Sequence, residues 1–226
     1  MLRNDIKIFI ESHADLINDN AWGQIYEDAY ATFGEALGLF TDAIIAANIN
    51  PLDFLEYVPA YYMIGSSEKK LDIPEGVKYI QDDAFAESKL EYINLPNSLQ
   101  TIGDNAFISS NIREIHFPPN ITFLGYSAFE ACWKLKEINM PDSITRMSSF
   151  CFAYCSDLER VKLSANLKQI DMHTFFECYR LKQLEIPESV TYISSDAIPT
   201  STELLVKENS YAHKYCMDNE HKYRLI

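Results

Sequence analysis

A repeat with a period of 22 or 23 residues dominates this chain and constrains its fold more than any other feature. Each of six consecutive units begins with an apolar residue, and Pro follows it in five of them. The unit starts are Ile73, Leu95, Phe117, Met140, Leu163 and Ile186. Twelve residues after each start comes a large apolar side chain. These are Phe85, Phe107, Phe129, Phe152, Phe175 and Ile198. So short a unit cannot enclose its own apolar side chains, so the repeat predicts a solenoid whose stacked coils share one core.

Each unit closes with a segment in which apolar and polar residues alternate, as in residues 90–95 and 112–117. This alternation is typical of a β-strand. One strand per coil predicts a parallel sheet with about 4.8 Å between neighbouring strands. The Pro that follows ends the strand, because it has no N–H to donate to the ladder. Asp82 and Asp104 precede the buried Phe, and we expect them to cap a single helical turn.

Three of the five cysteines follow the same period. Cys132, Cys155 and Cys178 lie 23 residues apart and take one position in three successive coils, while Ser88 and Ser110 stand nearby in the shorter coils. A reactive role is one interpretation, but a free thiol usually packs as a small hydrophobe, so we favour packing. The sequence contains no CxxC pair, so it indicates neither a zinc nor a redox motif.

The repeat resembles the BspA-like leucine-rich repeat family. The residues that carry the resemblance are 95–99, 102–107 and 128–132 with Leu135, and similar residues recur in every coil across 71–206. The pattern departs from the family at Ser164, at 150–151 and at 198–199. The resemblance implies a leucine-rich-repeat solenoid. It also implies a short closing helix after the last coil, in the segment 206–216.

The first seventy residues lack the repeat and are expected to be helical. The 3.6-residue spacing of apolar side chains predicts a helix that begins after Asn4 and a second, shorter one near Trp22. A capping box at Thr32 predicts a third helix, and Asn50 followed by Pro51 predicts a fourth. Residues 1–70 contain 11 acidic and 4 basic side chains. They could cap the first coil or serve as an acidic docking module, and we favour the cap.

Together these patterns predict an α+β fold with about six coils. The expected parts are a helical N-terminal cap or docking region over 1–70, BspA-like repeats over 71–206, and a C-terminal capping helix over 207–226. The formal net charge of −14 disfavours nucleic acid or an anionic membrane as the direct partner, since both are bound through basic surfaces. No apolar run is long enough to predict a membrane span. The charged N-terminus does not resemble a secretory signal, so we expect a cytoplasmic protein.

The sequence does not indicate an enzyme. It has no phosphate-binding glycine loop and no HExxH motif, and its five histidines lack a recognisable nucleophile and acid partner. His213 and Cys216, with His221 nearby, could hold a metal, although an ordinary surface helix explains their spacing better. We therefore expect no catalytic residues, no cofactor and no metal.

The outward positions of the closing strands form two columns of side chains on one face of the predicted sheet. The candidate protein-binding residues in these columns are Tyr92, Glu114, His116, Glu137, Asn139, Arg160, Lys162, Gln183 and Glu185. Tyrosine, arginine, histidine and asparagine suit protein recognition, although a solvated sheet would have a similar composition. A second candidate patch lies in the turn columns. It comprises Tyr79, Phe123, Arg146 and Tyr192.

Three functions fit these features to different degrees. We favour a non-enzymatic protein-binding module with a rigid repeat face. The alternative is an acidic, phage-encoded inhibitor of a basic nucleic-acid-binding defence protein of the host, such as an anti-CRISPR acting in the host cytoplasm. The acidic charge, on the helical front or on the whole surface, supports that alternative. A looser resemblance to small repeat proteins of phages and mobile elements of Gram-positive bacteria implies a genomic neighbourhood, not a mechanism. A hydrolase-like enzyme is the third hypothesis, and it lacks a visible polar pocket.

Overall fold

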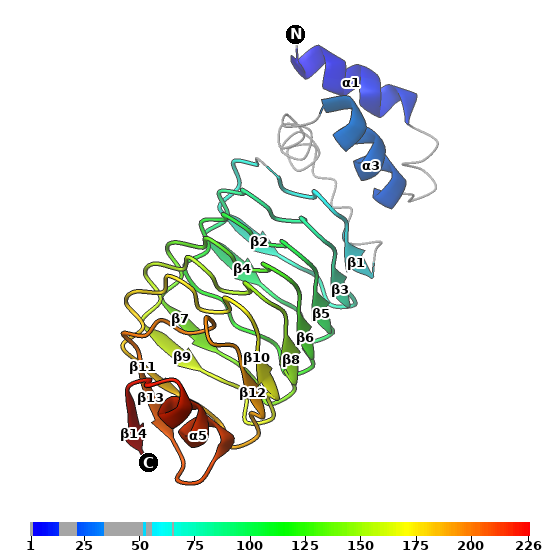
Figure 1. The fold of residues 1–226 in the computed structure, drawn as a ribbon. Helices are drawn as coiled ribbons and strands as arrows, with labels where there is room; N and C mark the ends of the chain where they lie inside the picture. The colour runs from blue at the N-terminus through cyan, green and yellow to red at the C-terminus, as the bar shows by residue number, and fades with distance from the viewer. Residues whose placement is uncertain (1, 14–21, 34–51, 53–55, 65) are drawn as a thin grey trace.

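The computed structural model describes residues 2–13, 22–33, 52, 56–64 and 66–226. Figure 1 shows stacked coils with helices α1 (Leu2–Ser12) and α3 (Trp22–Phe33) at one end and helix α5 (Tyr211–Asp218) at the other. The expected third helix and the first part of the fourth fall largely on 34–51 and 53–55, which lie outside the described residues. The fourth helix was expected to continue to Pro59, but residues 57–58 form a strand that pairs with the coils, so that part of the prediction was wrong. Thr32, expected to cap the third helix, lies inside α3 and donates its hydroxyl to the carbonyl of Asp28 at 2.8 Å.

Most of the closing segments form the predicted strands on one side of the coils, and all of their pairings are parallel. The segment 112–117 does not form the expected strand and contributes only an isolated bridge at Glu114. We call this side the long-strand face, because its strands have three or four residues. Its strands are β2 (Lys70–Asp72), β4 (Tyr92–Asn94), β7 (Glu137–Asn139), β9 (Arg160–Lys162), β11 (Gln183–Glu185), β13 (Glu203–Val206) and β14 (Tyr223–Leu225). In β4, β7 and β11 the middle side chain is buried and its two neighbours are exposed, as the alternation predicts.

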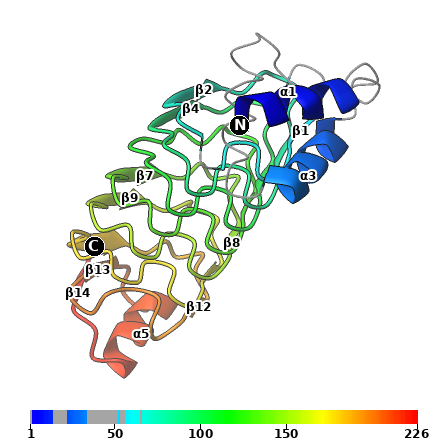
Figure 2. The same ribbon diagram turned by 90° about the horizontal axis from the view of Figure 1, so that it is seen from above.

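A second row of parallel strands, two residues each, lies on another side of the coils (Figure 2). We call it the short-strand row. Its members are β1 (Tyr57–Val58), β3 (Tyr79–Ile80), β5 (Thr101–Ile102), β6 (Phe123–Leu124), β8 (Arg146–Met147), β10 (Gln169–Ile170) and β12 (Tyr192–Ile193). Four residues that the sequence places in turns belong to these strands. They are Tyr79, Phe123, Arg146 and Tyr192. The placement in turns was wrong because a strand this short shows too little alternation to be recognised.

The recurrent phenylalanines stack in register through the interior. Neighbouring rings from Phe85 to Phe175 have centroids 4.8, 4.9, 5.3 and 5.8 Å apart, and their planes are inclined by 23° or less. All five rings are fully buried. The prediction that equivalent side chains lie above one another in a continuous core is therefore confirmed.

Turns on the third side of the coils hold neighbouring coils together through their backbones. The N–H of Phe107 donates to the carbonyl of Ala128 at 2.8 Å, and the N–H of Phe129 donates to that of Cys151 at the same distance. Asp82 and Asp104 do not cap helical turns, so that expectation was wrong. The carboxylate of Asp82 accepts the N–H of Asp104 at 2.8 Å, and that of Asp104 accepts the N–H of Tyr126 at 2.7 Å. These carboxylates thus connect successive coils.

The cysteine column is buried and hydrogen-bonded. The thiols of Cys132, Cys155 and Cys178 each donate to the carbonyl of a phenylalanine in the preceding coil, at 3.1, 3.2 and 3.1 Å. The hydroxyl of Ser110 lies 3.4 Å from the Cys132 sulfur and continues the column into the shorter coils. Burial raises the pKa of Cys132 and of Cys178 to about 12. The thiols therefore stay protonated near neutral pH, which supports packing over reactivity.

Both ends of the stack meet other elements. The ring of Tyr26 in α3 lies 5.2 Å from that of Tyr62, which in turn contacts Phe85 edge-on at 6.2 Å. At the other end the hydroxyl of Ser210 caps α5 by accepting the N–H of His213 at 3.1 Å. Helix α5 packs beside β12, β13 and β14. Apolar side chains of the terminal coils are thereby covered, as a solenoid requires.

Candidate functional site

The nine candidate residues all lie on the long-strand face, and all are exposed. Tyr92 lies in β4, and β7, β9 and β11 each contain two of the candidate residues. The pairs are Glu137 and Asn139 in β7, Arg160 and Lys162 in β9, and Gln183 and Glu185 in β11. Glu114 and His116 lie in the equivalent segment of the coil between β4 and β7. The two predicted columns therefore exist as rows of outward side chains.

Register brings several of these side chains together across neighbouring strands. Glu137 lies opposite Arg160, and their side chains form an ion pair with an Nη2–Oε2 distance of 2.6 Å. Asn139 lies opposite Lys162. The amide of Gln183 donates to the carboxylate of Glu203 in β13 at 2.7 Å. These contacts hold the exposed side chains in defined positions.

The strand ladder of this face opens in two places, between β9 and β11 and, first along the chain, between β4 and β7. Within the part of the chain that the structure describes, β4 meets the next coil through one bridge, Tyr92 to Glu114, and no strand pairing joins 114–116 to β7. The first opening lies near the change from 22- to 23-residue coils. The second lies between coils of equal length, so coil length alone does not set where the ladder opens.

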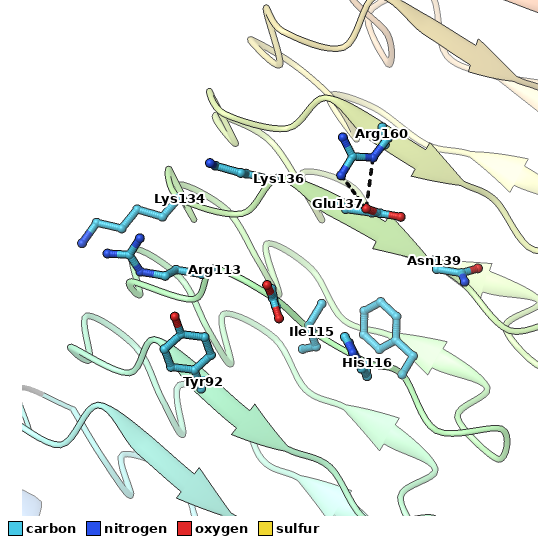
Figure 3. Close-up of a pocket in the computed structure, with 11 residues that line it drawn as sticks. Tyr92, Arg113, Ile115, His116, Lys134, Lys136, Glu137, Asn139 and Arg160 are labelled. Carbon is cyan, nitrogen blue, oxygen red and sulfur yellow. Dashed lines mark hydrogen bonds and ion pairs between the residues drawn. The ribbon is translucent and has the colours of Figure 1, made fainter.

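A shallow depression with a volume of about 690 Å³ occupies the opening between β4 and β7 (Figure 3). Six of the candidate residues line it. They are Tyr92, Glu114, His116, Glu137, Asn139 and Arg160. Its remaining lining residues were not predicted. They are Arg113, Ile115, Phe117, Lys134 and Lys136. The depression thus combines a partly apolar floor with charged side chains from three successive coils.

Two of the four Lys and Arg side chains at the depression are neutralised by acidic residues. The carboxylate of Glu91 lies 2.8 Å from Arg113 Nε and 3.4 Å from Lys69 Nζ. The hydrogen bond from Arg113 is the main cause of the lowered pKa of Glu91. Arg160 has a raised pKa for the corresponding reason, its hydrogen bond to Glu137. Lys134 and Lys136 form no ion pair with any described residue.

A second, more open depression of about 490 Å³ lies further along the same face. Arg160, Gln183 and Glu185 line it together with residues that were not predicted, among them Lys182 and Lys222. Lys162 lines neither depression. The other eight candidate residues are divided between the two depressions, and Arg160 contributes to both.

Three of the residues missed by the sequence analysis share one signal. Arg113, Lys136 and Lys182 each directly precede a closing strand, in a column that also contains Glu91 and Glu159. The prediction used only the two outward positions within each strand. Extending the columns by one position would have included these charged side chains at the rim of the face.

The second patch lies on the short-strand row, away from the long-strand face. Tyr79, Arg146 and Tyr192 are exposed there, and Phe123 is half-buried. These side chains occupy equivalent positions in β3, β8, β12 and β6.

His213 and Cys216 do not form a metal site with their neighbours. The Nδ1 atom of His213 accepts the N–H of Asn209 at 3.1 Å, and Cys216 is buried. No group of three or more His, Cys, Asp or Glu side chains that could hold a metal is found among the described residues. Within those residues there is also no helix that is both long enough and apolar enough to cross a membrane.

Six consecutive copies of the BspA type leucine rich repeat region match residues 78–204. The chain belongs to this family. The match covers more than half of the sequence and coincides with the coils that carry the phenylalanine stack. The resemblance noted in the sequence is therefore confirmed, and so is the leucine-rich-repeat solenoid.

Solved bacterial structures have the same fold as this BspA-type repeat chain. A leucine-rich repeat protein from T. pallidum is 21% identical, with a TM-score of 0.57, over 74% of this chain and 78% of that one. A leucine-rich repeat protein from Bacteroides ovatus is 23% identical, with a TM-score of 0.52, over 68% of this chain. The match spans only 43% of the B. ovatus protein. No curated protein matches the sequence.

Proposed function

We propose that this chain is a non-enzymatic protein-binding module that contacts its partner through the long-strand face. The observation that carries the proposal is the placement of the nine candidate side chains, exposed and in rows, around two neighbouring depressions. Leucine-rich repeat proteins in general mediate protein–protein interaction, so membership of the family supports this function.

The face is preorganised for binding. Backbone hydrogen bonds join successive coils on the turn side, and the phenylalanine stack fixes the interior behind the strands. A surface that is already ordered loses little conformational entropy when a partner docks, so more of the contact energy appears as affinity. Tyr92 and Arg160 are residue types that often dominate binding energy, and both line the larger depression.

The alternative function, inhibition of a basic host protein, would use a surface other than the long-strand face. Residues 1–70 carry 11 acidic and 4 basic side chains, which is half of the net charge of −14. An acidic docking module would therefore lie in the N-terminal region, and its binding would weaken strongly as salt increases. A phage origin belongs to this alternative, whereas a cytoplasmic location is proposed for either function.

Site-directed photocrosslinking tests which face is used. A photoreactive phenylalanine analogue is placed at Asn139 or Gln183 on the long-strand face. The matched controls carry it at Gln169 in β10 or at Thr191, directly before β12. Each protein is irradiated in a lysate of the source cells, and the adducts are identified by mass spectrometry. We expect a discrete protein adduct from the first pair only. Equal adducts from both rows, or adducts from the controls alone, would contradict the proposal.

A further inference from the structure

The long-strand face has a charge that is opposite to that of the whole chain. Five equivalent six-residue segments lead into and include its strands. They are 89–94, 111–116, 134–139, 157–162 and 180–185. These segments contain eight Lys or Arg and six Asp or Glu, a net charge of +2, whereas the chain has 19 and 33. The remaining residues therefore carry −16, so the positive side chains are concentrated on this face.

The residues that directly precede the closing strands form a column at the rim of the long-strand face, which we call the rim column. Their charges alternate in sign except at one place. From Lys69 onward the column alternates in sign through Glu91 and Arg113, and ion pairs join these three side chains. The next member is Lys136, so two cations follow one another without an acidic residue between them. After Lys136 the column alternates again. This exception coincides with the opening of the strand ladder between β4 and β7 and with the 690 Å³ depression.

Lys134 and Lys136 stand at this depression without a described acidic partner, while Arg113 and Arg160 are paired with Glu91 and Glu137. Figure 3 shows the two lysines and Arg113 on one side of the depression, with Tyr92 beside them. Glu114 is the one acidic lining residue for which no ion pair is found among the described residues. Ile115 and Phe117 supply apolar surface on the floor. The site is therefore built for an anionic group that is attached to an apolar one.

We propose that the depression between Tyr92 and Arg160 binds an acidic segment of a protein partner, with its carboxylates on Lys134 and Lys136 and an apolar side chain against Ile115 and Phe117. This inference rests on the proposed function and specifies its partner. Charge complementarity favours an acidic protein over a basic one at this face. A nucleic acid fits less well, because its closely spaced phosphates would meet Glu114 and Glu137 within the site and the strongly negative remainder of the chain around it.

The test selects random 12-residue peptides, displayed on a library, against the wild-type protein at low salt. We expect the selected peptides to be rich in Asp and Glu with at least one large apolar residue. A synthetic selected peptide should bind about tenfold more weakly to the Lys134→Gln, Lys136→Gln double variant. The matched control is Lys168→Gln, Lys214→Gln, which removes the same charge from exposed positions elsewhere and should leave the affinity within about twofold of wild type. Lys134→Arg, Lys136→Arg should bind like the wild type.

Every other outcome would overturn the acidic partner, the lysine site or the proposed function itself. Selection of basic peptides, or of none, would overturn the acidic partner, and so would equal weakening by the two double Gln variants. A single-stranded RNA oligomer that binds more tightly than the acidic peptide would replace the partner class. If Gln183→Ala and Arg160→Ala weaken a selected peptide but the lysine changes do not, the face binds peptide and only the lysine site fails. If no substitution on the long-strand face affects binding, the proposed function fails as well.

Discussion

The rings of Phe107 and Phe129 lie almost parallel, with 4.9 Å between their centroids and 6° between their planes. Each belongs to a different coil, so the contact joins two repeat units through their interiors. The same contact recurs between Phe129 and Phe152 at 5.3 Å. A ring in the middle of the stack therefore supports both of its neighbours.

Phe129→Ala should strongly destabilise the protein. The ring is fully buried between two others, so its removal leaves a cavity that adjacent coils cannot fill. We expect a loss of about 3–5 kcal/mol in the free energy of unfolding, measured by urea titration. Phe123→Ala in the same coil is the control, because its half-buried side chain in β6 should cost about 1 kcal/mol or less. Similar losses for both variants would contradict the register of the stack.

Gly125→Ala should also destabilise, for a different reason. An added Cβ at Gly125 would lie 2.5 Å from the carbonyl carbon of Gly103 in the preceding coil, so the two backbones would have to separate. We expect a loss of about 1–3 kcal/mol. Ser148 takes the equivalent position in the next coil, and Ser148→Ala should change stability by less than about 0.5 kcal/mol. A neutral Gly125→Ala variant would show that the coils do not approach this closely.

The five thiols should be unreactive in the folded protein. All five are buried, and burial raises the pKa of Cys132 to about 12 and that of Cys216 to about 11. A chromogenic disulfide reagent at pH 8 should therefore label none of them rapidly, and all five in denaturant. Ser156→Cys, an exposed position beside Cys155, provides a thiol that should react at once. Rapid labelling of any native cysteine would refute the packing role.

Asp83→Asn should stabilise the protein at neutral pH. Burial is the main cause of the raised pKa of Asp83, so the folded state binds this proton more tightly than the unfolded state does. Stability due to Asp83 therefore falls as pH rises from the unfolded pKa through the raised folded pKa. We expect the Asn variant to melt about 1–3 °C higher at pH 7 and to lose this advantage near pH 3.

Glu188→Gln controls for the simple removal of a negative charge. Glu188 is exposed in a later turn, so its substitution tests relief of overall repulsion without relief of burial. Its effect on the melting temperature should be smaller than that of Asp83→Asn at pH 7. An equal rise in the two variants would assign the effect to net charge instead.

The sequence predicts the interior better than the surface, because the interior repeats. Six equivalent apolar columns identify the stacked residues, and Phe85 through Phe175 occupy the predicted positions. The capping roles predicted for Asp82 and Asp104 were wrong, because a carboxylate before a turn can accept a hydrogen bond from an N–H of its own turn or from an N–H of the next coil. One unit of sequence does not distinguish these two acceptor geometries.

The candidate site was predicted in part. Alternation within the strands placed Tyr92, Glu137 and Arg160 on one face, and the structure brings all three to the larger depression. The depression itself was not predicted, since alternation within a strand does not indicate where neighbouring strands fail to pair. Lys134 and Lys136 were missed because they precede the strand, where the apolar alternation gives no direction for a side chain.

Each coil touches mainly the coil before it and the coil after it, through the ring stack and the turn-side hydrogen bonds. Loss or duplication of a whole unit in the run of equal length after residue 140 would restore the same neighbours on both sides of the junction. Such a change would shorten or extend the outer surface in steps of one strand spacing. The architecture thus allows evolution, or an engineer, to adjust how far the protein reaches along its target while the interior chemistry stays as it is.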